Sequence, residues 1–394
     1  MTDENMNAPV EIVESSHELE DFISHLSSKP EIAIDLEFDK NYYRFGFNLC
    51  LVQVFDGKTC CLIDPLSRNL DISVLFPLLE DPDITKVCFS FDEDLRLLHS
   101  LGCFPKNLYD LDIASRLLNY PAMSLSNLLI EILDIEPGES SQRSNWYRRP
   151  LSKKQVIYAA NDVLHLFELK KALDDKAFGR DVENWIKEEN SLLDQLDYSE
   201  ITNNHLVKEK EKREFNEIEW HIFKKLIYWR HDLARNFNKP DYQLIDKKLL
   251  VTLAKNSTSP TDWINRSGIF KKIKTEHFAQ QIHHLLASSR NEAIELGFKE
   301  SMPAQKPLSK EEQRKIYTEK KMISRFRNVF FDPVKAKIVE KYGIETANYI
   351  LSNRTLTDII TRQNGELESY KRELFYRCAE ELGLDTSEVA DILQ

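Results

Sequence analysis

Apolar residues follow different spacings in the two halves of this chain, and this difference constrains the fold more than any other sequence feature. In the first half, residues 31–38 interleave apolar and acidic positions as a strand does, and residues 49–55 and 59–63 are apolar runs of strand length. Asp56-Gly57 between these two runs signals a tight turn. Further along we expect helices at 17–26, 73–80, 92–101 and from 112 onward, and strands at 86–90 and near 108. This order predicts a mixed α/β sheet that contains a three-stranded meander.

The second half of the chain shows helical spacing only. Residues 192–214 are polar and charged, which indicates a linker, and apolar residues then recur at steps of three and four, as a buried stripe on a helix requires. These residues are Phe215, Ile218, Ile222, Leu226, Trp229 and Leu233. A second polar break carries Pro303 and Pro307. We therefore expect an α/β domain at 1–200, a helical domain at 210–295 and a second helical module at 305–394.

Charge is distributed unevenly between these halves. Residues 1–200 carry −18 and residues 201–394 carry +6, which together give the net charge of −12. An acidic half repels phosphate unless cations intervene, whereas a mildly basic half can hold a phosphate backbone directly. Ordinary solvated surfaces explain the same charges about equally well.

Composition narrows the class of protein. A chain of 394 residues with 42% hydrophobic residues can bury several cores, and no apolar run approaches the ~20 residues that cross a bilayer. The acidic start has no apolar signal-peptide core, so we expect a soluble cytoplasmic protein with no membrane partner. The six cysteines lack the spacing of a zinc site, so we expect them to be reduced side chains that pack in the core. A catalytic thiol is the alternative, but none of the six has a charged partner in the sequence that would indicate one.

The first candidate for chemistry is a pair of acids on the strand at 31–38. Asp35 and Glu37 are two residues apart, so their side chains leave the same face of a strand and can bind one hard cation through oxygen. The same D-x-E spacing recurs at Asp134 and Asp181, outside apolar strands, and a lone charged pair is usually solvated surface.

Two further candidates lie on predicted helices. Asp92-Glu93-Asp94 opens the helix at 92–101, where acids are also favoured for capping alone. Tyr158 and Asp162 are four residues apart and share one helix face, although Tyr242 and Asp246 repeat that spacing without an obvious site. Each pattern is weak by itself, and the order of all three within 165 residues is the informative feature.

In this order the chain resembles the ribonuclease D family of DEDD exonucleases, specifically the branch that carries a tyrosine. The resembling stretches are 34–38 with 51–53, 91–95, 151–163, and Arg143-Ser144-Asn145-Trp146 with Arg149-Pro150-Leu151-Ser152. The resemblance implies an RNase H-like exonuclease domain. It also implies that Asp35, Glu37, Asp94 and Asp162 ligate two divalent cations, Mg²⁺ or Mn²⁺, while Tyr158 positions the attacking water.

The chain departs from the family's pattern at two positions. Phe89 stands five residues before Asp94, where the family often has a polar residue, and Glu139 stands where a basic residue is expected before Trp146. Neither removes a metal ligand, but Glu139 puts substrate contacts of that loop in question. Asp110 matches an acidic position outside the four ligands.

The stretch from Trp229 to Arg235, followed by leucines near 250, looks like an HRDC module, the helical domain that follows the nuclease in ribonuclease D. The last region resembles a second such module only weakly. Candidate nucleic-acid contacts by charge and stacking are Arg143, Trp146, Arg149, Lys224, Arg230 and Lys271. Trp229 and Trp263 are candidates for stacking on bases, with core packing as the alternative for Trp229.

The resemblance therefore implies a two-metal 3′-5′ exoribonuclease that releases nucleoside monophosphates from RNA 3′ ends, with tRNA precursors as the implied substrate. We expect a monomer. Two rivals remain. A related DNA exonuclease would carry the same ligands, because the sequence does not show whether the site reads the 2′-hydroxyl. A silent binding scaffold would use the acids for structure only.

Overall fold

A computed structural model describes residues 8–136, 138–199, 206–257, 262–301, 309–361 and 367–390 of the protein. The contacts between residues divide the chain into two units. The sheet unit comprises residues 1–37, 50–198 and 308–394, and the helical unit comprises residues 38–49 and 199–307. Part of the predicted linker, residues 200–205, and both prolines of the second break lie outside the described residues.

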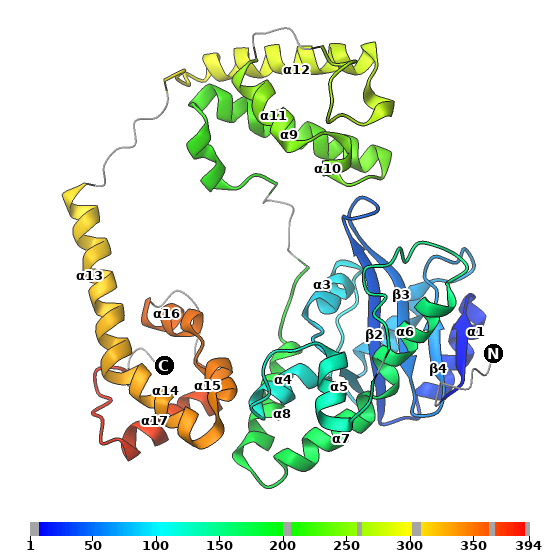
Figure 1. The fold of residues 1–394 in the computed structure, drawn as a ribbon, viewed down its shortest axis with the longest axis vertical. Helices are drawn as coiled ribbons and strands as arrows, with labels where there is room; N and C mark the ends of the chain where they lie inside the picture. Colours follow the sequence, from blue (N-terminus) through cyan, green and yellow to red (C-terminus); the bar gives the residue numbers. More distant parts are fainter. Residues whose placement is uncertain are drawn as a thin grey trace. The chain divides into compact units, whose positions relative to one another are not determined.

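A six-stranded sheet forms the centre of the sheet unit, in the order β1-β4-β3-β2-β5-β6 (Figure 1). The strands are β1 (Val10–Val13), β2 (Glu31–Lys40), β3 (Phe47–Phe55), β4 (Cys60–Ile63), β5 (Thr85–Cys88) and β6 (Leu108–Asp110). β3 and β4 pair antiparallel, whereas β1 with β4, β2 with β5 and β5 with β6 pair parallel. The sheet is therefore mixed, as the sequence predicts, and β2, β3 and β4 are neighbours as expected.

Nine helical segments precede, separate and follow the strands of this unit in the described part of the chain. They are α1 (Ser16–Leu26), η1 (Ile72–Leu75), α2 (Phe76–Glu80), α3 (Asp92–Ser100), α4 (Leu111–Leu117), α5 (Leu125–Leu133), α6 (Lys153–Leu164), α7 (Leu166–Ala177) and α8 (Asp181–Leu193). The described residues of β4 are all buried, which is typical of a strand covered on both faces. α6 packs against β4, and Figure 1 shows it crossing the sheet there.

The last helices of the chain pack on the sheet unit. They are α13 (Lys310–Phe326), η4 (Arg327–Phe331), α14 (Asp332–Tyr342), α15 (Ile344–Ile350), α16 (Asn353–Thr361) and α17 (Ser369–Glu381). Thr346 donates a hydrogen bond to the Leu117 carbonyl at 3.0 Å, and Tyr370 stacks on Trp185 with ring centroids 5.5 Å apart. Residues 308–394 thus share a core with the sheet domain. That residues 1–200, 210–295 and 305–394 form three separate domains stays a prediction.

The helical unit contains η2 (Glu209–Glu214), α9 (Glu217–Phe237), α10 (Asp241–Leu244), α11 (Lys247–Lys255), η3 (Lys271–Ile273) and α12 (Glu276–Glu295). Its core contains the predicted stripe of α9, including Ile218, Ile222 and Leu226. Trp229 lies at the edge of that core and is half-buried. Among the described residues, none of the helices combines the length and the apolar character that a bilayer-spanning helix needs.

Candidate metal centre

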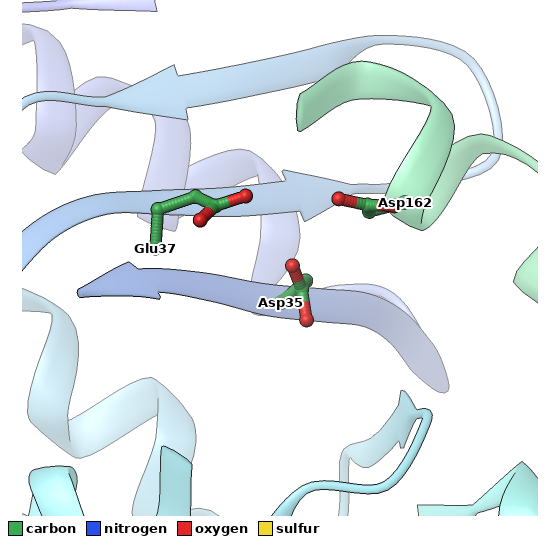
Figure 2. A group of neighbouring side chains, drawn as sticks. All are labelled: Asp35, Glu37 and Asp162. Carbon is green, nitrogen blue, oxygen red and sulfur yellow. The ribbon is translucent and has the colours of Figure 1, made fainter. Parts of the chain in front are cut away.

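One face of β2 carries four acids, Glu31, Asp35, Glu37 and Asp39, and the structure separates their roles. Glu31 at the start of the strand forms an ion pair with Lys170 at 3.6 Å. Asp35 and Glu37 point toward Asp162 of α6 (Figure 2), and one carboxylate oxygen from each of these three residues lies within 4.8 Å of the other two. The Asp39 carboxylate instead accepts backbone N–H groups of Tyr42 and Arg44 at 3.0 and 2.8 Å. Asp35 and Glu37 therefore belong to a cluster, and Asp39 holds the turn that follows the strand.

Helix α6 presents its candidate residues through a well-defined start. Ser152 caps the helix by accepting the N–H of Gln155, whose side-chain oxygen in turn accepts the backbone N–H of Ser152. The cap fixes where the helix begins, so Tyr158 and Asp162, one turn apart, face the same way. The Tyr158 hydroxyl hydrogen-bonds Asp162. The predicted i, i+4 pair is thus brought to the β2 acids.

Asp94 lies in the first turn of α3 and is only 7% exposed. It is outside the group of three acids whose oxygens lie within 4.8 Å, but Asp35 and Asp94 act on each other electrostatically, and Asp94 also acts on Glu37. Its buried Oδ1 has no hydrogen-bond partner among the described residues. The N-cap of α3 is Phe91, without a side-chain cap, so Asp94 is not explained by capping.

A residue outside the predicted ligands holds Asp94 in place. Both carboxylate oxygens of Asp110 accept backbone N–H groups at the β5–α3 turn, from Ser90 at 2.7 Å and from Phe91 at 2.8 Å. Ser90 has a positive φ of 54°, so the turn needs this support. Burial raises the pKa of Asp110 to about 6, and these hydrogen bonds act in the opposite direction. Asp110 is therefore a positioning residue for α3.

Burial of like charges dominates the electrostatics of the cluster. Burial raises the pKa of Asp35 to about 7, and it raises the pKa of Glu37, with further contributions from Asp35 and Asp162. The pKa of Asp162 is raised by burial and by Asp35. The pKa of Tyr158 is raised by burial and then by these acids, so its hydroxyl keeps its proton at neutral pH.

These observations fit divalent cations. Every donor in the cluster is a carboxylate or hydroxyl oxygen, the type that Mg²⁺ and Mn²⁺ prefer. Among the groups that shift the pKa values of Asp35, Glu37 and Asp162 there is no lysine or arginine in the described part of the chain. The buried Oδ1 of Asp94, which accepts no hydrogen bond from the described residues, is a further oxygen that can bind a cation.

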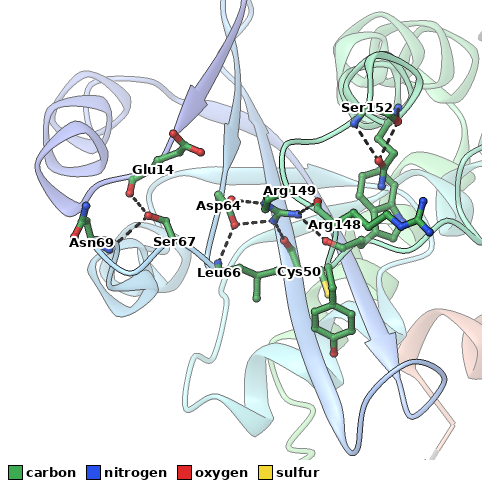
Figure 3. A network of polar contacts seen from close by, with 12 residues as sticks. Glu14, Cys50, Asp64, Leu66, Ser67, Asn69, Arg148, Arg149 and Ser152 are labelled. Carbon is green, nitrogen blue, oxygen red and sulfur yellow. Dashed lines mark hydrogen bonds and ion pairs between the residues drawn. The ribbon is translucent and has the colours of Figure 1, made fainter. Parts of the chain in front are cut away.

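The loop before α6 plays a structural part that the sequence did not reveal. The Arg149 guanidinium donates to both oxygens of buried Asp64 and to the backbone carbonyls of Cys50, Trp146 and Arg148 (Figure 3). All of its donor nitrogens are thus engaged within the protein. The prediction that Arg149 contacts nucleic acid is corrected: this side chain anchors the loop to β3 and to the end of β4.

Trp146 in the same loop is also unavailable to a ligand. It is 2% exposed, and its ring lies 6.2 Å from the ring of Tyr158, measured between centroids. It therefore supports the tyrosine rather than contacting nucleic acid. The structure also places the two residues that depart from the family pattern. Phe89 packs against the core, and Glu139 forms an exposed ion pair with Lys154 at 2.8 Å.

The remaining predicted nucleic-acid residues divide by exposure. Arg230 is 8% exposed and donates to the Ile245 carbonyl at 3.1 Å, so it is a structural residue of the helical unit. Arg143 and Lys271 are exposed and Lys224 is half-buried, and their contacts with nucleic acid stay a prediction. Asp64 was not predicted, although a signal for it exists in the sequence, because it directly follows the buried run that forms β4. Asp110 lies in the same way at the end of β6.

The part of the chain that carries this site is similar to known exonucleases. A family model described as 3′-5′ exonuclease matches residues 10–177, which contain the four acids and Tyr158. Ribonuclease D of Desulfotalea psychrophila is 29% identical over 250 residues, 62% of this chain and 66% of that protein. Ribonuclease D of Pseudomonas paraeruginosa is 34% identical over 243 residues, 58% of this chain and 61% of that protein. These matches therefore span less than two thirds of the curated relatives.

Solved structures support the fold over almost the whole chain. Escherichia coli RNase D, described as an exoribonuclease involved in structured RNA processing, matches with a TM-score of 0.66 and 20% identity, covering 95% of this chain and 99% of that one. A protein from Bifidobacterium adolescentis matches with a TM-score of 0.69 and 18% identity, covering 95% and 100%. At these identities the likeness shows the fold, and the predicted sheet domain followed by helical regions is confirmed.

Proposed function

We propose that the protein, whose residues 10–177 match a family model described as 3′-5′ exonuclease, is a metal-dependent exoribonuclease of the ribonuclease D type. It would remove nucleotides from RNA 3′ ends as nucleoside 5′-monophosphates. The observation that carries the proposal is the convergence of Asp35, Glu37 and Asp162 within 4.8 Å, with the unpartnered oxygen of Asp94 beside them. A structural role does not explain these acids, because no lysine or arginine is among the described groups that shift the pKa values of Asp35, Glu37 and Asp162, and buried like charges without such a balance destabilise a fold.

The chemistry follows from the donors of the site. Asp35, Glu37, Asp94 and Asp162 would hold two Mg²⁺ or Mn²⁺ ions. When bound, such a pair supplies positive charge that lowers the pKa of water and offsets the charge of the scissile phosphate. The water oxygen forms a bond to the terminal phosphorus, the bond from phosphorus to the 3′-oxygen of the preceding nucleotide breaks, and one water proton passes to that 3′-oxygen. Tyr158, which stays protonated, orients the water by hydrogen bonding.

The proposed substrate is structured RNA with a trailing 3′ end, such as a tRNA precursor, and the proposed setting is a monomer in the cytoplasm. The descriptions of the matched relatives and of the Escherichia coli structure support RNA over DNA. Digestion of matched RNA and DNA strands that differ only in the sugar tests this choice. Faster hydrolysis of RNA is expected, and a clear preference for DNA would overturn the choice of substrate.

The reaction itself is tested with 3′-labelled RNA and the full chain. We expect release of labelled mononucleotide with Mg²⁺ or Mn²⁺ and none with EDTA. Asp134→Asn is a matched control, because Asp134 also begins a D-x-E triplet but is exposed and has a positive φ of 57°, which asparagine tolerates. Full turnover by Asp134→Asn together with none by Asp162→Asn supports the proposal. Metal-independent release of nucleotides would refute it.

A further inference from the structure

A hollow on the surface of the helical unit has the chemical character of a nucleobase site. It measures about 490 Å³ and is lined by Trp229 of α9 and by five residues of α12. Those residues are His277, Gln280, Gln281, His284 and Leu285. The volume lies within the range of small-ligand sites. In sequence, the residues that line the hollow are far from those of the metal centre, and they belong to the other unit.

The lining combines one aromatic wall with hydrogen-bonding amides and imidazoles. His277, Gln281 and His284 follow each other at steps of four and three, so they line one face of α12. The Gln281 amide donates to His277 Nε2 at 3.1 Å, which leaves its carbonyl oxygen and one N–H for a ligand. Among the described residues that line the hollow there is no lysine, arginine or acid, so the hollow is poorly suited to phosphate but suited to an uncharged polar ring.

The aromatic wall is held rigidly from behind. The indole of Trp229 meets that of Trp263 edge to face, with ring centroids 5.9 Å apart. Trp263 is 1% exposed and donates from Nε1 to the Ile273 carbonyl at 2.6 Å. Trp229 is thus a preorganised platform with one side in the core and the other in the hollow. A flat ring that stacks there loses little to rearrangement of the protein.

We infer that this hollow binds an unpaired base of RNA, with Trp229 stacking on the base and the side chains of Gln281 and His284 hydrogen-bonding its edge. A nucleobase has the required shape, a π-face and a rim of donors and acceptors, and only an unpaired base exposes both. The inference takes its ligand class from the proposed function, but it does not depend on hydrolysis. It gives the helical unit a base-reading role separate from the phosphate contacts predicted for its lysines.

The test is the affinity of the full chain for short single-stranded RNA, measured by fluorescence anisotropy with labelled RNA. The Asp35→Asn background and EDTA prevent digestion. We expect Trp229→Leu to weaken binding by about 5- to 100-fold, the range for one stacked base, and the double variant Gln281→Ala, His284→Ala to weaken it in the same direction. Abasic RNA of the same length should bind wild type and Trp229→Leu alike.

Matched controls lie next to the two key residues. Tyr228 is 49% exposed beside Trp229, and His283 is exposed beside His284, yet neither lines the hollow. Tyr228→Leu and His283→Ala should therefore bind RNA like the wild type. The double variant changes exposed residues only, so it carries the test even where Trp229→Leu perturbs the fold.

Tryptophan emission gives an independent readout on the wild-type side chains. Trp146, Trp185, Trp220 and Trp263 are all 5% exposed or less, so quenching by a ligand at the surface reports on Trp229. RNA should quench this emission and abasic RNA should not. The inference is overturned if the double variant binds RNA as tightly as His283→Ala, or if abasic RNA quenches equally. These binding measurements contain no metal, so a negative result would not bear on the proposed hydrolysis. Failure to find metal-dependent hydrolysis would in turn not bear on whether the hollow binds a base.

Discussion

Two groups of buried acids in the sheet unit differ in what balances their charge. Glu189 of α8 is 8% exposed, and it accepts hydrogen bonds from Tyr370 and from Lys371, the latter at 2.6 Å. Glu37 is 6% exposed, and its neighbours are other acids. A buried acid that serves structure is thus paired by the protein, whereas the β2 acids leave their charge to a ligand.

This comparison gives the proposed function its physical basis. The fold tolerates Glu189 because Lys371 and two tyrosines compensate it within the same unit. At the metal centre the compensating groups among the described residues are the Tyr158 hydroxyl and the backbone N–H groups of Leu36 and Asp94, all of them uncharged, so bound cations must provide the rest of the compensation. Substitution of one group at a time tests whether the stability and the activity respond differently at the two clusters.

The largest effect is expected from removing a ligand. Asp35→Asn or Asp162→Asn should lower the rate of RNA hydrolysis by more than about 100-fold, the upper end of what loss of an outer-shell partner costs at metal sites. In EDTA the same variants should melt at the same temperature as the wild type or higher, because each removes one of several repelling acids. Single-turnover hydrolysis and circular dichroism melts measure the two effects. Loss of activity with a lower melting temperature would indicate a structural role instead.

The paired cluster should respond in the opposite way. Lys371→Met leaves Glu189 buried beside an apolar side chain, which should lower the free energy of unfolding by about 3–5 kcal/mol. The activity of the folded fraction should be unchanged. Denaturant titration measures the loss. Lys187→Met is the control, because its ion pair with Glu183 on α8 is exposed and contributes at most about 1 kcal/mol. Equal effects of the two variants would remove the contrast.

Cations should stabilise the unpaired cluster specifically. At a Mg²⁺ or Mn²⁺ concentration of about 100 times the Kd, binding to the folded state adds about 2.7 kcal/mol to stability. The melting temperature of the wild type should therefore rise relative to EDTA, and that of Asp35→Asn should rise much less. Thermal melts with each cation measure both shifts. An equal rise in the two proteins would place the binding elsewhere.

The smallest effect concerns pH in the absence of metal. Burial raises the pKa of Asp35 from 3.8 to about 7, so the folded state holds a proton that the unfolded chain releases. The associated stability is fully present below pH 3.8 and is lost as the pH rises to about 7. Melts in EDTA should show this decline in the wild type and a weaker one in Asp35→Asn. A decline of the same size in both would assign it to other groups.

Local patterns in the sequence were sufficient for the parts of the site that depend on spacing. The alternation in β2 places Asp35 and Glu37 on one face, and the helix period of α6 aligns Tyr158 with Asp162, so both pairs were predictable. The acidic start of α3 was ambiguous between capping and ligation, and only the fold shows that Asp94 is uncapped and buried near Asp35.

Contacts between distant residues were not predictable in the same way. Arg149 resembled a phosphate contact because its partner Asp64 lies 85 residues away in sequence and nothing local links them. The burial of Trp146 and of Arg230 likewise depends on tertiary packing that no local pattern indicates. The strand β1 has only four residues, too few for a clear alternation, and it was missed. The packing of α17 on α8 through Tyr370 depends on residues more than 180 positions apart.

The central claim is that Asp35, Glu37, Asp94 and Asp162 together hold two cations. Anomalous diffraction from crystals of the full chain grown with Mn²⁺ tests it most directly, because each bound ion gives a peak. The account predicts two peaks about 3.5–4 Å apart, both within ligand distance of these carboxylates. Mn²⁺ bound elsewhere while this cluster stays empty would contradict it.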